Sequence, residues 1–400
     1  MQEHTTKPFP LPSLDDLYAS IHGRVVEVVE ELLRFEMDHV LGLARYERGE
    51  ERRGYRHGSE RRRVTTELGP VEIRVPRGRI RQSDGSFTEA ASQVLPRYAR
   101  RTRKVDETIL GTYLSGTNTR RIRKALGPIL GGTHLSKSAV SRVTARLKDL
   151  FARWESRDLS EEAYPLLYLD AIHLKVRLVR RVVSVPVLAA LGVREDGQKV
   201  LIALRLAVRE SGSSWGDLVE DLGRRGLPAP VLVVSDGHRG FRVAEKLWPG
   251  ADFQRCTHHK WENLKAHCPK HAHPELLRDY HTIVRATSGP AARRAYHRFV
   301  EKWRELCPAV VRSLEEAGER LLTFYRFPRA MWRSIRTTNM IENLNREFRR
   351  RTKTQASFSS EAGAVTLLYG LVAFGQIHLR KVDGYMHLTE LVRRSEEQVA

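Results

Sequence analysis

Apolar residues in the first third of the chain recur mainly at helical spacing. Residues 14–45 carry them at steps of three and four, which predicts one long helix. Its apolar positions are Leu17, Ile21, Val25, Val28, Leu32 and Phe35. Residues 48–63 follow as an Arg-rich loop, and residues 71–75 alternate apolar and charged side chains, which predicts a short strand. Helical patterns over 109–114, 117–126 and 135–147, the last with Ser136 as its cap, resemble a helix-turn-helix.

The pattern changes to that of strands after residue 164. Three apolar stretches, 166–176, 182–193 and 200–208, follow one another with a turn signal at 195–198, which predicts three antiparallel strands. Residues 213–226 then have helical spacing, and 231–234 form a fourth apolar stretch bounded by prolines. Because the helix is a crossover connection, we expect the fourth strand to lie parallel to the first, in an α/β fold.

Two aspartates interrupt or end these predicted strands. Asp170 lies inside the first apolar stretch and Asp236 follows the fourth, so adjacent central strands would carry both carboxylates. A buried charge is costly unless it is paired or bound to a metal ion. Ligands of open α/β sheets bind at the carboxyl ends of strands. The alternative for Asp236 is a turn or N-cap residue with no other role.

The rest of the chain returns to helical spacing. Residues 265–330 predict several helices, and another begins at Thr338 or Asn339. That helix would bury Ile341, Leu344 and Phe348. Its opposite, polar face would carry Glu342, Asn345, Arg346 and Arg349. Glu342 could serve a site or only complement the helix dipole. A helical pattern over 364–378 precedes a polar end.

Composition indicates a polyanionic partner. The 400 residues include 69 Lys+Arg and 48 Asp+Glu, which gives a net charge of +21. Such an excess argues most simply for nucleic acid, although an Arg-rich loop can also be a solvated surface. No run of about 18 apolar residues and no signal peptide is found, so we expect no membrane contact and a cytoplasmic protein. Three cysteines do not make a disulfide framework.

Four stretches resemble, in order, the motifs of one family. They read LDAIHLKVR, SDGHRGF, QRCTHHKWENL and RTTNMIENLNREFRRR. Together they are similar to the mutator-type DDE transposases of bacterial insertion sequences. The resemblance covers roughly residues 95–370, and residues 51–81 also resemble the family's N-terminal region. It implies an RNase H-like catalytic core with an all-α insertion before the Glu-bearing helix. Positions 236 and 342 are 106 residues apart, which leaves room for that insertion.

The resemblance also implies the site residues. It makes Asp170, Asp236 and Glu342 the catalytic and metal-binding carboxylates, with two Mg²⁺ or Mn²⁺ ions as cofactors. The chemistry agrees, because hard cations take oxygen ligands and paired cations promote phosphodiester cleavage and transfer. Cys256 and His259 match the family's Cys-x-x-His signature. The alternative for this pair is a structural zinc site, formed by Cys256, His259, Cys268 and His271.

The implied division of the chain has six parts. They are an N-terminal helical and Arg-rich region (1–92), a helix-turn-helix-like DNA-binding domain (93–155), the first part of the core (160–255), the helical insertion (256–330), the Glu-bearing helix of the core (331–380) and a C-terminal tail (381–400). The region before the core is thus expected to be mainly helical and to bind DNA.

The implied activity is binding of terminal inverted repeats, followed by metal-dependent DNA cleavage and strand transfer. The partners would be double-stranded DNA, at transposon ends and target, and at least a second copy of the chain, in the nucleoid of a bacterial cytoplasm. The basic residues expected on DNA are Arg97, Arg100, Arg101, Arg120, Arg121, Lys137, Arg142, Arg346, Arg349 and Arg350. A basic DNA-binding regulator and an RNase H-like nuclease without strand transfer are the alternatives.

Overall fold

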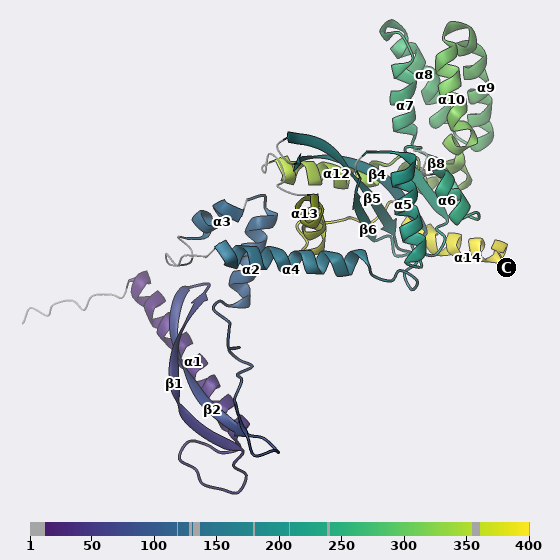
Figure 1. Cartoon of the computed structure of the whole chain (residues 1–400). Coiled ribbons are helices and arrows are strands. Elements are labelled where there is room, and N and C mark those ends of the chain that lie inside the picture. The colour runs from purple at the N-terminus through teal and green to yellow at the C-terminus, as the bar shows by residue number, and fades with distance from the viewer. Residues whose placement is uncertain are drawn as a thin grey trace, which may run out of the picture. The chain divides into compact units, whose positions relative to one another are not determined.

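The computed structural model describes residues 13–117, 119–127, 130, 137–178, 181–207, 209–237, 241–353 and 361–399. The chain forms two compact units (Figure 1). The first comprises residues 1–113 and 117–144, and the second comprises residues 114–116 and 145–400. Both contain helices, and both contain a sheet, so the protein is a mixed α/β protein.

The first unit begins with a helix packed on a small antiparallel sheet. The sheet has the strand order β1-β2-β3. Its elements are α1 (Leu14–Leu41), β1 (Gly54–Thr66), β2 (Gly69–Arg81) and β3 (Phe87–Glu89). Ser13 caps α1 in a reciprocal pair of bonds with Asp16. The helix ends four residues before the predicted limit, because Gly42 adopts a left-handed conformation with φ 76° that stops it.

The predicted Arg-rich loop is wrong for residues 54–63, which form most of β1. The region before the core therefore contains a small sheet as well as the predicted helices. β1 pairs with β2 along nearly its whole length, with Arg61 opposite Arg74 and Arg63 opposite Glu72. Its middle is exposed and basic, so it lacks the apolar alternation by which a strand is recognised. β2 also continues through Pro76, next to a register shift in β1 where the missing amide is tolerated.

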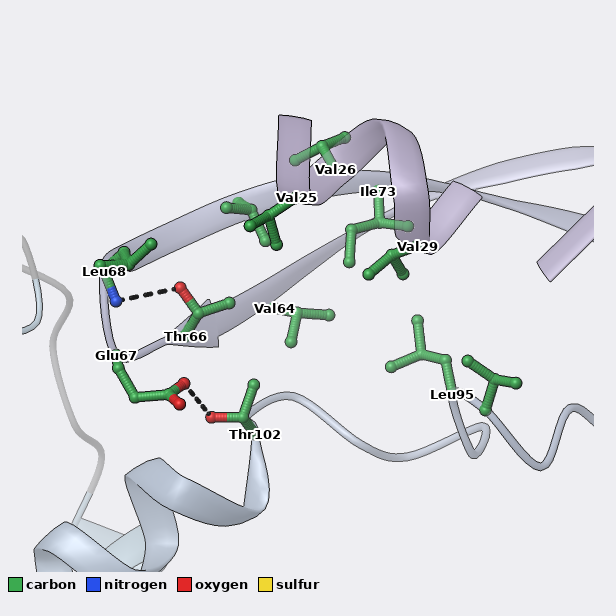
Figure 2. Close-up of a pocket in the computed structure, with 12 residues that line it drawn as sticks. Val25, Val26, Val29, Val64, Thr66, Glu67, Leu68, Ile73, Leu95 and Thr102 are labelled. Carbon is green, nitrogen blue, oxygen red and sulfur yellow. Dashed lines mark hydrogen bonds between the residues drawn. The ribbon is translucent and has the colours of Figure 1, made fainter. Parts of the chain in front are cut away.

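One side of α1 packs on this hairpin. The core there is formed by Leu33, Val64, Val71, Ile73, Val75 and Leu95, with Val26, Val29 and Ala99 partly buried against it. A cavity of about 410 Å³ lies between the helix and the hairpin. Figure 2 shows Val25, Val26 and Val29 on its helical side and Val64 and Ile73 on its sheet side. The hairpin and helix thus leave an incompletely filled apolar space.

Three helices follow in the predicted helix-turn-helix-like stretch. They are α2 (Arg103–Leu114), α3 (Thr119–Leu126) and α4 (Lys137–Glu155). A small core joins them, formed by Val105, Ile109, Ile122, Leu126 and Leu130 with Tyr113 and Val143 against it. The predicted cap Ser136 lies outside the described residues. The helices agree with the predicted pattern, whereas their use in DNA binding stays a prediction.

The second unit is built on a five-stranded mixed sheet. Its order is β6-β5-β4-β7-β8, with β4, β5 and β6 antiparallel and β4, β7 and β8 parallel. The strands are β4 (Leu166–Leu178), β5 (Arg181–Val193), β6 (Lys199–Leu206), β7 (Leu232–Ser235) and β8 (Asp252–Arg255). The connecting helices are α5 (Gly212–Arg224) and α6 (Phe241–Leu247). The first four strands have the predicted order and directions. The pattern did not indicate β8, which is only four residues long.

Alternation along β4 and β7 assigns the two faces of this sheet. Leu167, Leu169 and Val233 pack with α5 and α6 in one apolar core. Because successive side chains of a strand point to opposite faces, Tyr168 and Asp170 lie on the other face. The Tyr168 hydroxyl there donates to the carbonyl of Ser334. The helices of that face are α12 (Asn339–Thr352) and α13 (Glu361–Ala373), which contact β4.

A helical insertion lies between β8 and α12. Its helices are α7 (Thr257–Ala266), α8 (His273–Val284), α9 (Gly289–Leu306) and α10 (Pro308–Ala317), which lie side by side in Figure 1. They share one apolar core, which includes Leu276, Tyr280, Phe299, Trp303 and Leu314. Short 3₁₀ turns at 270–272, 318–321, 323–326 and 329–331 and α11 (Trp332–Ile335) complete the path. After α13, a turn at 385–387 and α14 (Leu388–Val399) occupy the predicted tail.

The insertion is bonded to the edge of the sheet. The buried Gln254 of β8 accepts a hydrogen bond from the Phe324 amide at 2.8 Å and donates to the Leu321 carbonyl at 3.2 Å. Within the insertion, Lys260 of α7 is 1% exposed. Its ammonium donates to the Ser313 carbonyl at 2.8 Å and to Glu316 of α10 at 2.6 Å. The bonds of Gln254 connect the sheet to the turns after α10, and those of Lys260 connect α7 to α10.

Candidate active site

Two of the predicted carboxylates lie on neighbouring strands. β4 and β7 are parallel, and Leu169 is paired with Ser235. Asp170 is the next residue of β4 and Asp236 is the first residue after β7, so they stand side by side on the face that α12 covers. Asp170 is 8% exposed, whereas Asp236 is half-buried in the turn after β7. The predicted placement of these two aspartates at adjacent central strands is therefore confirmed.

The electrostatics of Asp170 follow from this placement. Burial raises the pKa of its carboxyl to about 7, and the charges of Asp236 and, more weakly, Glu342 also raise it. The charge of His259 acts in the opposite direction. Carboxylates that repel one another in a dry setting are stabilised as anions by added positive charge. The donor set is thus suited to cations.

The third predicted carboxylate is held by the residue that begins α12. Thr338 is fully buried and is the N-cap of this helix, but its side chain makes no capping bond. Its hydroxyl instead donates to Oε1 of Glu342 at 2.6 Å. The predicted buried stripe of α12, Ile341, Leu344 and Phe348, is confirmed. Packing of that stripe and the Thr338 bond together fix the orientation of Glu342.

Cys256 and His259 surround the same hydroxyl. The buried Cys256 Sγ lies 3.4 Å from both the amide nitrogen and Oγ1 of Thr338. His259 Nδ1 lies 3.4 Å from Thr338 Oγ1, and its Nε2 lies 3.8 Å from Oε1 of Glu342. A hydroxyl carries one hydrogen, which the short bond to Glu342 takes. The Thr338 amide donates to the Cys256 sulfur, and the Thr338 oxygen is left to accept a hydrogen bond from the His259 imidazole.

His259 contributes positive charge to this site. The hydrogen bond with Cys256 raises the pKa of its imidazole to about 9; Cys256, Asp236 and Asp170 add to the shift electrostatically, and burial opposes it. The imidazole is consequently protonated at neutral pH. It lies beside Glu342 and balances part of the negative charge of the three carboxylates.

The donor atoms fit divalent cations in two ways. Asp170, Asp236 and Glu342 offer oxygen ligands, which Mg²⁺ and Mn²⁺ prefer. Among the described residues, Cys256, His259 and Glu342 also form a group whose ligand atoms all lie within 4.8 Å of one another. Neither Cys268 nor His271 belongs to that group, so the predicted four-residue zinc alternative is not assembled.

Asn345 is a residue of the site that the pattern placed wrongly. The predicted polar face of α12 includes it, but it is 1% exposed and donates to Oδ2 of Asp170 at 2.9 Å. Within the described part of the chain, its amide oxygen has no hydrogen-bond partner. Asn345 lies three residues after Glu342, and residues at that spacing share a helix face. This spacing was the sign in the sequence that Asn345 lies on the same face of the helix as Glu342.

Replacing Asn345 by leucine tests this role. The variant keeps the side-chain size but leaves Asp170 without its donor. The metal-dependent DNA cleavage that the motifs imply should then fall about 10- to 100-fold, the loss typical of residues that orient metal ligands. The Mn²⁺ concentration needed for half-maximal cleavage should rise as well. A thermal unfolding midpoint close to that of the wild type separates this result from misfolding. Unchanged cleavage at every Mn²⁺ concentration would contradict the role.

The turn that carries Asp236 is also constrained by a buried arginine. Gly237 has φ 91°, which non-glycine side chains rarely adopt. A Cβ at this position would lie 1.0 Å from Nη1 of Arg255. Arg255 is 7% exposed, and its Nη2 lies 3.9 Å from Glu316. The glycine therefore allows the guanidinium to lie directly against the Asp236 turn.

The predicted DNA-contacting residues are mostly on the surface. Arg97, Arg100, Arg121, Arg142, Arg346, Arg349 and Arg350 are exposed. Arg101 is the exception, because its side chain is 15% exposed and its Nε binds Asp106 at 2.7 Å. Arg350 is paired with Glu347 at 2.8 Å. The side chains of Arg120 and Lys137 lie outside the described part of the structure. Contact with DNA stays a prediction for all ten.

No helix within the described ranges combines the length and the apolar character needed to cross a membrane.

The fold and the site together define an α/β protein with an acidic cluster on its central strands, closed by a helix that supplies a third carboxyl.

Comparison with known proteins identifies the family. Residues 11–376 match the family described as Transposase, Mutator family. The chain is 33% identical over 365 residues to the transposase for insertion sequence element ISRM5 of Rhizobium meliloti (strain 1021), which covers 91% of this chain and 89% of that protein. It is 32% identical over 376 residues to the transposase for IS1081 of Mycobacterium tuberculosis, covering 93% and 88%. The chain belongs to the mutator family of transposases, as its motifs predict.

Proposed function

We propose that this protein is a DDE transposase, which binds the terminal inverted repeats of its insertion sequence and catalyses metal-dependent DNA cleavage and strand transfer. The observation that carries the proposal is the meeting of Asp170, Asp236 and Glu342 on one face of the sheet, in a member of this transposase family. In this proposal the five-stranded sheet with α12 is an RNase H-like core. The strand order and the position of the acidic residues support that assignment.

The chain's own residues would divide the work as follows. Asp170, Asp236 and Glu342 would hold two Mg²⁺ or Mn²⁺ ions. When bound, such ions activate an attacking hydroxyl and stabilise the leaving oxygen. Asn345 orients Asp170, and Thr338 orients Glu342 through the bonds described above. His259 balances charge next to Glu342. No covalent intermediate with the protein is required, so we assign no nucleophilic side chain.

The partner is double-stranded DNA, at the ends of the element and at its target. The net charge of +21 supports a polyanionic partner. The basic end of α12, with Arg346, Arg349 and Arg350, begins one turn beyond Glu342, which suits phosphates close to the acidic site. Helices α2 to α4 are the proposed reader of the end sequence. Bringing two ends together calls for at least a dimer, acting on the nucleoid in a bacterial cytoplasm.

Metal dependence is the direct test. Purified protein is incubated with labelled transposon-end DNA in chelator, in Mg²⁺ and in Mn²⁺. We expect nicked or joined products with either cation and none in chelator, while a mobility shift shows end binding in all three conditions. Products that form in chelator would contradict the carboxylate mechanism.

The products also separate the alternatives. End binding without metal-dependent products in any condition would favour a basic DNA-binding regulator. Nicked products without joined ones would favour a nuclease of the same fold. Joined products, in which a freed 3′-hydroxyl is linked to another strand, are the outcome expected for a transposase.

A further inference from the structure

Helix α1 has two apolar sides, and the hairpin covers only one of them. The covered side carries Leu33, Met37 and Leu41, which are buried. The other side forms a stripe that we call the outer stripe: Leu14, Tyr18, Ile21, Val25, Val28, Leu32 and Phe35. These seven side chains are between 38% and 74% exposed. A continuous row of large exposed apolar residues marks an interaction surface rather than an ordinary solvent face.

The spacing of the outer stripe indicates another helix as the occupant. Its residues alternate steps of four and three from position 14 to position 35, which is a seven-residue repeat sustained over three heptads. A repeat of this kind keeps one seam of a helix facing a partner helix along the whole contact. With 28 residues, α1 is about 42 Å long, so the seam extends over most of its length. A compact ligand would not require such a repeat.

We propose that the outer stripe binds the outer stripe of a second copy of this chain, as an antiparallel pair of α1 helices. Charge complementarity favours this occupant and this direction. In an antiparallel pair that sets Val25 opposite the partner's Val28, Arg24 lies beside the partner's Glu31, and symmetry repeats the contact. Both residues are exposed and flank the seam. In a parallel pair, Glu31 would lie beside the partner's Glu36, which is a repulsive contact.

The surrounding structure is compatible with this pairing. Glu36 flanks the seam and is held by bonds from the Ser92 hydroxyl and the Gln93 amide of its own unit. Arg24 forms an exposed ion pair with Glu27, at 2.9 Å, which costs little to exchange for the pair with the partner's Glu31. Val25 belongs both to the outer stripe and to the wall of the cavity in Figure 2, so a helix on the seam would also shield the mouth of that cavity.

This inference deepens the proposed function. It rests on that function for one expectation, that two DNA ends are held together. It is tested without DNA or metal, by the mass of the full-length protein in solution. Val28→Glu places a charge in the seam and should raise the dimer dissociation constant at least about 100-fold. The matched control is Gly23→Glu, which adds the same charge to the same helix at an open position away from the seam. It should leave the dimer intact.

Charge exchange and cross-linking test the direction. Arg24→Glu and Glu31→Arg should each weaken the dimer, and the double variant should restore it. In a Cys307→Ser background, the Tyr18→Cys/Phe35→Cys variant should form disulfide-linked dimers. Neither single-cysteine variant should form them, because in an antiparallel pair residue 18 of one copy would lie about 25 Å from residue 18 of the other. Cross-linking of either single variant would show a parallel pair and overturn the proposed direction.

Two other results would overturn the inference. A wild-type protein that stays monomeric at about 50 µM, far above the concentrations at which stable dimers dissociate, leaves the outer stripe to another part of the chain or to another ligand. A dimer that Val28→Glu does not weaken has its interface elsewhere. If the protein dimerises through α1 but does not cleave DNA, the proposed function is contradicted and the dimer is not. If it is a monomer that cleaves and joins DNA, the dimer is contradicted and the proposed function is not.

Discussion

Replacing Asp236 by asparagine is expected to reduce cleavage of transposon-end DNA by about three orders of magnitude or more. The substitution keeps the size of the side chain and its place in the turn after β7 but removes one negative oxygen from the proposed metal site. Binding of the ends should stay close to that of the wild type, because the proposed phosphate contacts come from basic residues on other elements. Labelled ends report cleavage, and a mobility shift on the same DNA reports binding.

The matched control for this variant is Asp217→Asn. Asp217 is exposed on α5, so the same chemical change occurs in the same unit without touching the acidic site. It should cleave as the wild type does. Wild-type cleavage by Asp236→Asn in Mg²⁺ would remove Asp236 from the proposed mechanism, whatever the behaviour of the control.

Gly237→Ala is expected to destabilise the second unit by about 3 kcal/mol or more and to lower cleavage as well. A left-handed φ costs a non-glycine residue roughly 1–2 kcal/mol. The new Cβ would also displace the buried guanidinium of Arg255, and forced repacking of an occupied interior costs a further 1–3 kcal/mol or so. Because Asp236 precedes this position directly, its carboxylate would shift too. Thermal unfolding and end cleavage measure the two effects.

Gly375→Ala separates the backbone cost from the packing cost within the same unit. Gly375 has φ 67°, which is also left-handed, but the nearest atom to a Cβ there is Cε1 of His378, at 4.0 Å. Its variant should pay only the conformational penalty and should cleave normally. Equal destabilisation by the two variants would mean that Arg255 moves aside freely, and the proposed constraint on the Asp236 turn would be wrong.

Sequence patterns predicted the elements of the site better than its contacts. Apolar stretches placed β4 and β7 side by side with Asp170 and Asp236, because strand order follows from local pattern and connection. The burial of Asn345 could not be read in the same way. Its helix was predicted, but the side of the helix that faces Asp170 depends on how α12 packs across the sheet. The contact joins Asn345 to Asp170, which are 175 positions apart in the sequence.

Two further differences have the same origin in tertiary contacts. Four of the 13 residues of β1 are arginines and only its last three are buried, so it is a strand because β2 supplies its hydrogen-bonding partners. In α1, the apolar residues that reveal the helix are the exposed ones, whereas Leu33 and Met37 pack on the hairpin. A periodic pattern thus identifies a helix without telling which of two apolar sides its own unit will bury.

The joint between β8 and the insertion has a consequence for exchanging parts between relatives. On α7, His259 faces Glu342 while its neighbour Lys260 is anchored to Glu316 on α10. A chimaera that received a foreign α8–α10 on this α7 would leave the Lys260 ammonium buried without its acceptor. We therefore expect functional hybrids only when the transplanted segment starts at β8 and ends after Thr338, so that both sides of α7 come from one parent.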